Sequence, residues 1–303
     1  MIVFAYVVLV FLILRFSVTL FNFLSNPKLG HYGKKFDDKV SIIIHPSFDE
    51  SEKLKQSILA QDYKNVEILM AQSQEALTTT ILNASGKYLL FIDSSSVIKK
   101  GLINSLIYRT KVFDLKFIVL IPNKTFKTIE DYLLLPIADF VILNILPLRL
   151  VRLLNLPSLA AASNRYLFYD AASYRQKEFN DGVDDRKVET LLANGMIVSD
   201  RTTSFKETSR ELLKIFDENA LTISVYLLLL IAGPLVLILN FEFALISLPI
   251  GLIFLTRIMI SFLTKQNPLI NVIVHPLQML ALTGLLVAGV FKKLFTSGVH
   301  SGS

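Results

Sequence analysis

The chain has 303 residues, of which 52% are hydrophobic and 18% are charged, and its mean hydropathy is +0.53. Soluble domains carry about 25% charged residues, so this composition excludes a disordered chain and an ordinary soluble enzyme. The absence of cysteine excludes disulfides, thiolate metal sites and a cysteine nucleophile, while the net charge of +6 has to be interpreted from where the charges lie.

An apolar segment opens the chain. Residues 1–24 hold a single charge, Arg15, and exceed the roughly 20 residues that a membrane-spanning helix needs. The segment lacks the basic start and the small-residue cleavage site of a signal peptide. It is therefore predicted to be an uncleaved N-terminal transmembrane helix.

Residues 36–216 alternate between short apolar runs and helix-like stretches, which is typical of an α/β domain with a mainly parallel sheet. The predicted strands cover residues 40–44, 65–70, 88–93 and 116–121. Ligands of such sheets bind at the carboxyl ends of the strands. Because His45, Gln72 and Asp93 occupy these ends, they are candidates for a binding site.

Residues 132–157 are apolar, but prolines break them too often for a clean membrane crossing, and they include Arg149 and Arg152. One interpretation places this segment in the domain core. The other, which we favour, is a pair of helices in the headgroup region of the membrane, with the two arginines facing lipid phosphate. Such helices would hold one face of the domain against the bilayer.

Three further apolar runs, each close to the length of a spanning helix, cover residues 221–239, 241–263 and 269–291. Basic residues flank the first two membrane segments on the side of the α/β domain, so the positive-inside rule predicts a multi-pass membrane protein with a cytoplasmic main domain. Lys292 and Lys293 would then lie outside, against the rule, which leaves the orientation of the last segment open. Within that segment, His275 is either a functional polar group or a partner for a carbonyl freed by Pro276.

Several short motifs, spread in order over nearly the whole chain, carry a resemblance to a known family. They are Val40-Ser41-Ile42-Ile43-Ile44 with Asp49-Glu50, Leu59-Ala60-Gln61-Asp62-Tyr63, Val66-Glu67-Ile68, Ala84-Ser85-Gly86-Lys87-Tyr88 continuing to Asp93, Leu167-Phe168-Tyr169 continuing to Tyr174, Val183-Asp184-Asp185, and His275-Pro276. Together they resemble the membrane-bound family 2 glycosyltransferases, within them the branch that glycosylates carotenoid and other polyisoprenoid lipids. The resemblance implies a GT-A fold, an α/β nucleotide-diphospho-sugar transferase domain, with one transmembrane helix before it and three after it.

In that family, an acceptor hydroxyl displaces a nucleoside diphosphate from a sugar. The leaving diphosphate is usually neutralised by Mn2+ or Mg2+ held by an Asp-x-Asp, and the hydroxyl needs a carboxylate base. The resemblance implies that Asp93 is the ligand of the metal or diphosphate, with Ser95 in place of the second aspartate. The implied base is Asp184, with Asp185 beside it. The implied contacts of the nucleotide are His45, Asp49 and Gln72.

The chain departs from the family pattern in the nucleotide-binding half of the site. The second strand ends in Met70-Ala71-Gln72-Ser73 where the family has an aspartate pair, and the Asp-x-Asp ends in Ser95. Residues 74–83 are also shorter than the corresponding family segment. Correlated loss of this kind is expected of a site that is no longer used. The carboxylates have structural explanations too, because Asp93 can serve a turn and Asp49 a helix start.

The sequence therefore leaves two possible functions. The first is a membrane-bound glycosyltransferase that moves a sugar from a nucleotide-sugar to a lipid or lipid-linked acceptor. The alternative is an inactive pseudo-glycosyltransferase that acts as a scaffold or partner subunit in a membrane complex. The expected partners are membrane lipid, nucleotide-sugar and a membrane protein. Glycine-rich phosphate loops, a Gly-x-Ser-x-Gly elbow and zinc-ligand spacings do not occur in the sequence, and the mostly juxtamembrane basic residues argue against nucleic acid.

Overall fold

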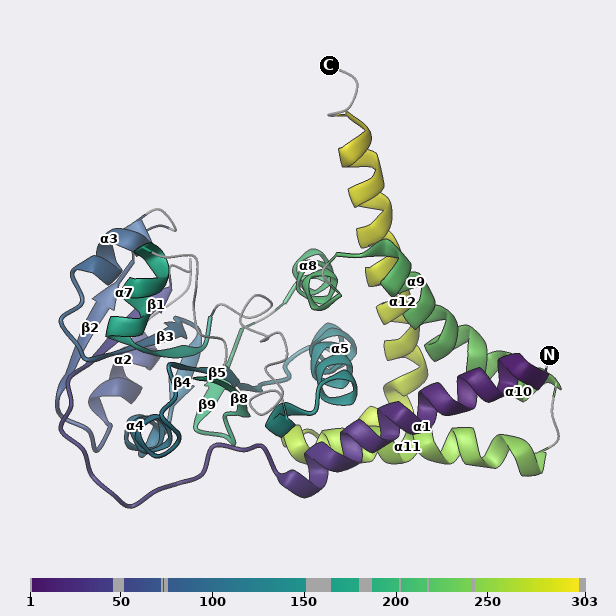
Figure 1. Cartoon of the computed structure of the whole chain (residues 1–303), viewed down its shortest axis with the longest axis horizontal. Helices are drawn as coiled ribbons and strands as arrows, with labels where there is room; N and C mark the ends of the chain where they lie inside the picture. The colour runs from purple at the N-terminus through teal and green to yellow at the C-terminus, as the bar shows by residue number, and fades with distance from the viewer. Residues whose placement is uncertain are drawn as a thin grey trace. The chain divides into compact units, whose positions relative to one another are not determined.

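A computed structural model describes the chain at residues 2–45, 52–71, 73, 76–150, 165–179, 187–201, 203–216, 218–240 and 243–299 (Figure 1). The chain divides into two compact units. The helical unit comprises Met1–Asn26, Phe126–Pro147 and Thr202–Ser303. The sheet unit comprises Pro27–Thr125 and Leu148–Arg201.

The sheet unit is built on a six-stranded mixed sheet. In spatial order its strands are β2 (Val66–Met70), β1 (Val40–His45), β3 (Tyr88–Asp93), β7 (Leu167–Asp170), β5 (Phe117–Ile121) and β8 (Val188–Leu192). β1 runs parallel to both β2 and β3, whereas β7 runs antiparallel to its neighbours β3 and β5. Every residue of β1 and β3 is buried, as expected for strands covered on both faces.

Helices cover both faces of this sheet (Figure 1). They are α2 (Glu52–Leu59), α3 (Ala76–Leu82), α4 (Leu102–Phe113) and α7 (Ala171–Phe179). Successive strand residues point to opposite faces, so Ile42 joins the apolar cluster that includes α2 and α4, while Ile43 joins the cluster that includes α3 and α7. A second, three-stranded sheet is formed by β4 (Ser96–Ile98), β9 (Ile197–Ser199) and β6 (Asn123–Lys124).

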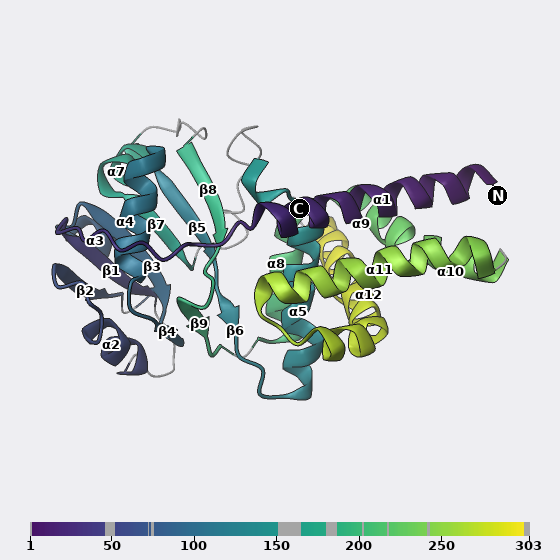
Figure 2. The same cartoon turned by 90° about the horizontal axis from the view of Figure 1, so that it is seen from below.

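Among the residues that the structure describes, four helices are long and apolar enough to cross a membrane, and all lie in the helical unit: Ile2–Ser25, Ala220–Leu239, Ile246–Thr264 and Pro268–Phe291. The elements of the unit are α1 (Ile2–Ser25), α5 (Ile129–Ile145), α8 (Phe205–Ile215), α9 (Ala220–Leu227), η3 (Leu228–Ala232), α10 (Gly233–Asn240), α11 (Phe243–Thr264) and α12 (Pro268–Val299). α1 runs alongside α11 (Figure 2). The π-helical turn η3 precedes Pro234, a residue that cannot donate the hydrogen bond a regular α-helix requires.

Most of the proline-interrupted segment forms one helix, α5, which packs against α1 and α12. Its first turn is closed by a capping box between Thr128 and Asp131. At its end, Asn22 of α1 donates from Nδ2 to the carbonyl oxygens of Leu143 (2.9 Å) and Leu146 (2.8 Å). α5 is therefore an integral part of the helical unit.

Two arginines of the proline-interrupted segment, Arg149 and Arg152, were expected to face lipid phosphate, and the structure describes one of them. Arg149, expected to face lipid phosphate, belongs to the sheet unit and donates from Nη1 to Glu189 Oε1 at 3.2 Å. Glu189 also accepts two hydrogen bonds from Arg109, at 2.7 and 2.6 Å. Arg152 lies outside the described residues.

Candidate functional site

The carboxyl ends of β1 and β3 bring two of the predicted site residues together. His45 and Asp93 are partners in the parallel register of these strands. Both side chains are buried, and the His45 ring lies 5.9 Å from the ring of Phe91. The structure therefore places His45 and Asp93 on neighbouring strands at the carboxyl ends, where ligands of open α/β sheets bind.

Both carboxylate oxygens of Asp93 have hydrogen-bond partners. Oδ1 accepts from the backbone N–H of Ser95 at 3.0 Å and from its hydroxyl at 2.6 Å. Oδ2 accepts from Nη1 of Arg165 at 2.8 Å. Burial acts to raise the pKa of Asp93, but the donors of Ser95 and the guanidinium of Arg165 outweigh it, so the pKa lies below its usual value. Asp93 is therefore a carboxylate at neutral pH.

The antiparallel strand β7 brings Arg165 to this site. β7 pairs with β3 so that Leu167 lies opposite Phe91, and continuing that register places residue 165 opposite Asp93. The next residue, Tyr166, is hydrogen-bonded to Ser96 of β4 (2.9 Å) and Ser199 of β9 (3.0 Å). Burial, together with the nearby charge of Asp93, raises the pKa of Tyr166 to about 12, so the phenol stays neutral. This network ties the turn after Asp93 to the smaller sheet.

Arg165 is the residue of this site that the sequence analysis missed. It lies two residues before the strand Leu167–Asp170, whose first residues belong to a motif that the resemblance did include. The one sequence signal that could have indicated Arg165 is a basic residue next to a stretch typical of a strand. Without the register of β7 against β3, that signal does not connect Arg165 to Asp93.

The described residues of this loop do not fit a divalent cation. An Asp-x-Asp site takes carboxylate oxygens from two side chains, but here the second side chain is Ser95, whose hydroxyl donates to Asp93. The other oxygen of Asp93 is bound to a guanidinium. Within the part of the chain that the structure describes, His, Cys, Asp and Glu side chains form no group of three or more that could hold a metal ion.

Four of the predicted site residues lie outside the described part of the chain. They are the nucleotide contacts Asp49 and Gln72 and the carboxylates Asp184 and Asp185. Their assignments stay predictions. At the end of the edge strand β2, the side chain of Met70 is 47% exposed.

The sequence matches no family model and no curated protein. The structure is similar to the mannosyltransferase PcManGT from Pyrobaculum calidifontis in complex with GDP-Man and Mn2+, with a TM-score of 0.53, 10% identity, and coverage of 96% of this chain and 99% of that chain. Two further similar structures are S. aureus TarS 1-349 in complex with UDP-GlcNAc (TM-score 0.37, 9% identity, 86% and 92% covered) and mannosyl-3-phosphoglycerate synthase from Rubrobacter xylanophilus (TM-score 0.34, 8% identity, 59% and 72% covered). The last two likenesses are too weak to carry an argument. The first shows a GT-A-type fold, so the predicted fold class is confirmed.

Proposed function

We propose that this chain is a membrane-bound glycosyltransferase that moves a sugar from a nucleotide-sugar to a lipid or lipid-linked acceptor. The observation that carries the proposal is the ionised Asp93 beside His45 at the carboxyl ends of two neighbouring parallel strands in a GT-A-type sheet. The described part of the same chain carries four helices of membrane-spanning length. A catalytic domain on such helices suits an acceptor that stays in the bilayer.

The reaction would break the bond between the anomeric carbon of the sugar and the diphosphate, and form a bond from that carbon to the acceptor oxygen. The acceptor hydroxyl gives its proton to a carboxylate base, for which Asp184 is the candidate. The leaving diphosphate takes the electron pair and needs positive charge. Arg165 is suited to that role, because its side chain is 36% exposed and a guanidinium keeps several N–H donors beyond the one that holds Asp93.

The lipid branch of the resemblance and the membrane orientation belong to the same proposal. The basic flanks support an orientation with the sheet unit in the cytoplasm, where nucleotide-sugars are made available, and with the N-terminus outside. An acceptor of the polyisoprenoid class would approach from the membrane. The likeness to PcManGT, which was solved with GDP-Man and Mn2+, supports a nucleotide-sugar donor.

One observation favours the scaffold as a second candidate. Asp93 is only 2% exposed, and its carboxylate is bound on both oxygens by Ser95 and Arg165, as a purely structural turn would be. Ligand binding decides between the two.

The test is titration calorimetry of the full-length protein in detergent with UDP and GDP, in EDTA and in Mn2+. We expect one nucleoside diphosphate to bind, and Arg165→Gln to weaken that binding about tenfold through the loss of a charge-assisted hydrogen bond. Lys187→Gln is the matched control, since it removes a cation from the same unit, where Lys187 pairs with the exposed Asp114. Failure of both nucleotides to bind under either condition would contradict the proposal and leave the scaffold.

A further inference from the structure

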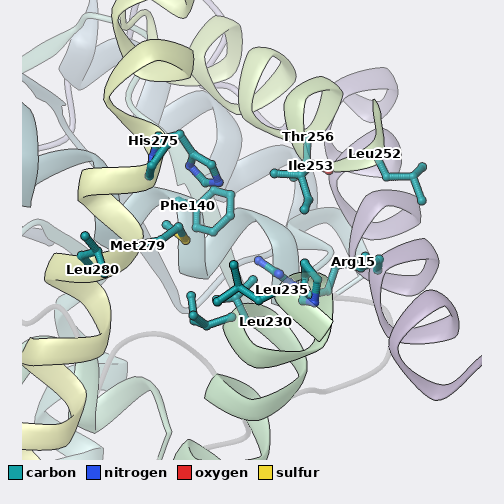
Figure 3. Close-up of a pocket in the computed structure, with 14 residues that line it drawn as sticks. Arg15, Phe140, Leu230, Leu235, Leu252, Ile253, Thr256, His275, Met279 and Leu280 are labelled. Atoms are coloured by element: carbon teal, nitrogen blue, oxygen red, sulfur yellow. The ribbon is translucent and has the colours of Figure 1, made fainter. Parts of the chain in front are cut away.

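The helical unit contains a cavity of about 320 Å3 between α1, α5, α11, α12 and the segment from η3 to α10 (Figure 3). This volume falls within the roughly 300–1,000 Å3 that is common for ligand pockets. Its walls are apolar apart from Arg15, Thr256 and His275. Leu235 and Leu280 also line it and are 54% and 67% exposed, so the cavity opens to the surroundings of these membrane-length helices.

Two polar side chains of the cavity have buried nitrogen atoms without a hydrogen-bond partner. Arg15 is 7% exposed, and its Nε donates to Asn144 Oδ1 at 3.0 Å, while its Nη2 has no partner. His275 is 6% exposed, and its Nδ1 also has no partner. The carbonyl freed by Pro276 therefore does not account for this nitrogen of His275.

The ring of Phe140 joins these groups to a second buried arginine. The guanidinium carbon of Arg15 lies 5.1 Å from the Phe140 ring centre, and that of Arg257 lies 5.3 Å from it. The His275 ring meets the same ring edge-on at 5.3 Å. Arg257 is fully buried and donates to Gln278 at 2.5 Å, and its Nε and Nη1 have no partner.

The charges around the cavity do not balance. Among the described residues of the helical unit, the buried charged side chains are Arg15, Arg257, Asp131 and Asp139. Asp131 is engaged in the capping box of α5, so Asp139, which interacts electrostatically with Arg257, is the one carboxylate set against two guanidinium groups. One positive charge is left in an apolar environment, where an unpaired cation is strongly disfavoured.

We infer that this cavity binds a membrane lipid that carries a phosphate monoester. The phosphate supplies the missing negative charge and accepts hydrogen bonds from Arg15 and His275. The hydrocarbon chain lies along the apolar wall and leaves the cavity past Leu235 and Leu280 into the bilayer. The inference does not depend on sugar transfer, because the lipid can bind whether or not the sheet unit is an enzyme.

The experiment compares two single-chain probes with the same oleoyl tail. Oleoyl lysophosphatidic acid ends in a phosphate monoester, and monooleoylglycerol has a neutral head. The full-length protein in detergent is incubated with each, and bound lipid is measured by native mass spectrometry. We expect lysophosphatidic acid to bind at least about tenfold more tightly, the effect of one charge-assisted contact, and an equal concentration of inorganic phosphate not to displace it.

Variants connect this preference to the cavity. Arg15→Gln should bring the two probes to nearly equal binding, whereas Arg210→Gln, which removes an exposed guanidinium from α8 of the same unit, should leave the preference intact. Leu280→Trp fills the cavity from its exposed rim without touching a buried polar group, and it should reduce binding of lysophosphatidic acid even if Arg15→Gln fails to fold.

Three outcomes with the unchanged protein or with Leu280→Trp would overturn the inference. They are equal binding of the two probes to the unchanged protein, displacement of the lipid by inorganic phosphate, and undiminished binding of lysophosphatidic acid by Leu280→Trp. A phosphate preference that survives in folded Arg15→Gln would overturn it as well. Because the readout involves no nucleotide, these results are independent of the nucleotide titration.

Discussion

At the scale of single residues, Glu67 shows how one carboxylate can join three parts of the sheet unit. It lies on β2 and accepts hydrogen bonds from the hydroxyl of Ser41 on β1 and from the backbone N–H of Ser85 (2.6 Å) and Gly86 (3.1 Å) before β3. Lys39 adds an ion pair at 3.0 Å. Burial acts to raise the pKa of Glu67, but the hydrogen bonds and the ion pair together outweigh burial and lower the pKa to about 2.

The pKa of Glu67 predicts a dependence of stability on pH. Because the folded-state value of about 2 lies below the ordinary 4.5, Glu67 stabilises the fold above about pH 4.5, and this contribution is lost as the pH falls towards 2. We expect Glu67→Gln to lower the free energy of unfolding at pH 7 by about 1–3 kcal/mol and to flatten its decline between pH 4.5 and 2. Denaturant titrations of the detergent-solubilised protein across this range measure both effects.

The matched control for this prediction is Glu52→Gln, since Glu52 is an exposed carboxylate on α2. Its pH profile should follow that of the unchanged protein. If Glu67→Gln kept the same slope as the control, the network around Glu67 would not contribute to stability.

At the scale of elements, the Ser-Gly motif before β3 has a structural role. A Cβ atom on Gly86 would lie 2.5 Å from both the backbone nitrogen and the hydroxyl oxygen of Ser41 on β1. The N–H of Gly86 donates to that same hydroxyl at 2.8 Å. Glycine therefore allows the start of β3 to approach β1 closely, and a motif quoted for a family resemblance is explained by strand packing.

Replacing this glycine should weaken the joint between β1 and β3. We expect Gly86→Ala to cost about 1–3 kcal/mol of stability, because a methyl group at 2.5 Å from backbone forces the two strands apart. Thermal unfolding in detergent checks this. Gly33→Ala is the control, since a Cβ there meets nothing within 4 Å, and its melting temperature should be unchanged. A similar loss in both variants would contradict the explanation.

At the scale of the whole molecule, the described residues include four helices of spanning length, and basic residues flank the sheet unit in the sequence. The positive-inside rule then predicts an external N-terminus and a cytoplasmic sheet unit. Since the chain has no cysteine, single introduced cysteines can report this orientation without background.

We expect a membrane-impermeant maleimide to label Ile2→Cys in intact cells, and to label Lys100→Cys only after the membrane is permeabilised. Both positions are exposed, so both should react in permeabilised cells, which serves as the control for reactivity. Labelling of Lys100→Cys in intact cells would place the sheet unit outside the cytoplasm and remove the nucleotide-sugar supply that the proposed function requires.

The sequence by itself determined the class of this protein. Hydropathy and strand character are local properties, so apolar runs such as residues 1–24 and 88–93 could be recognised as a membrane-length helix and a buried strand without knowledge of their neighbours. The position of Asp93 at a strand end follows from the same local pattern. The fold class could therefore be predicted, and the similarity to PcManGT confirms it.

Only the tertiary structure decided which side chains meet. Arg165 reaches Asp93 through the antiparallel register of β7, and Arg15 reaches Asn144 across 129 residues of sequence. α5 joins the helical unit because its buried face finds partners on α1 and α12, which lie far from it in the sequence. Strand register and helix packing depend on the complementarity of distant surfaces, so the salt bridge of Asp93 and the charged cavity at Arg15 could not be found in any local pattern.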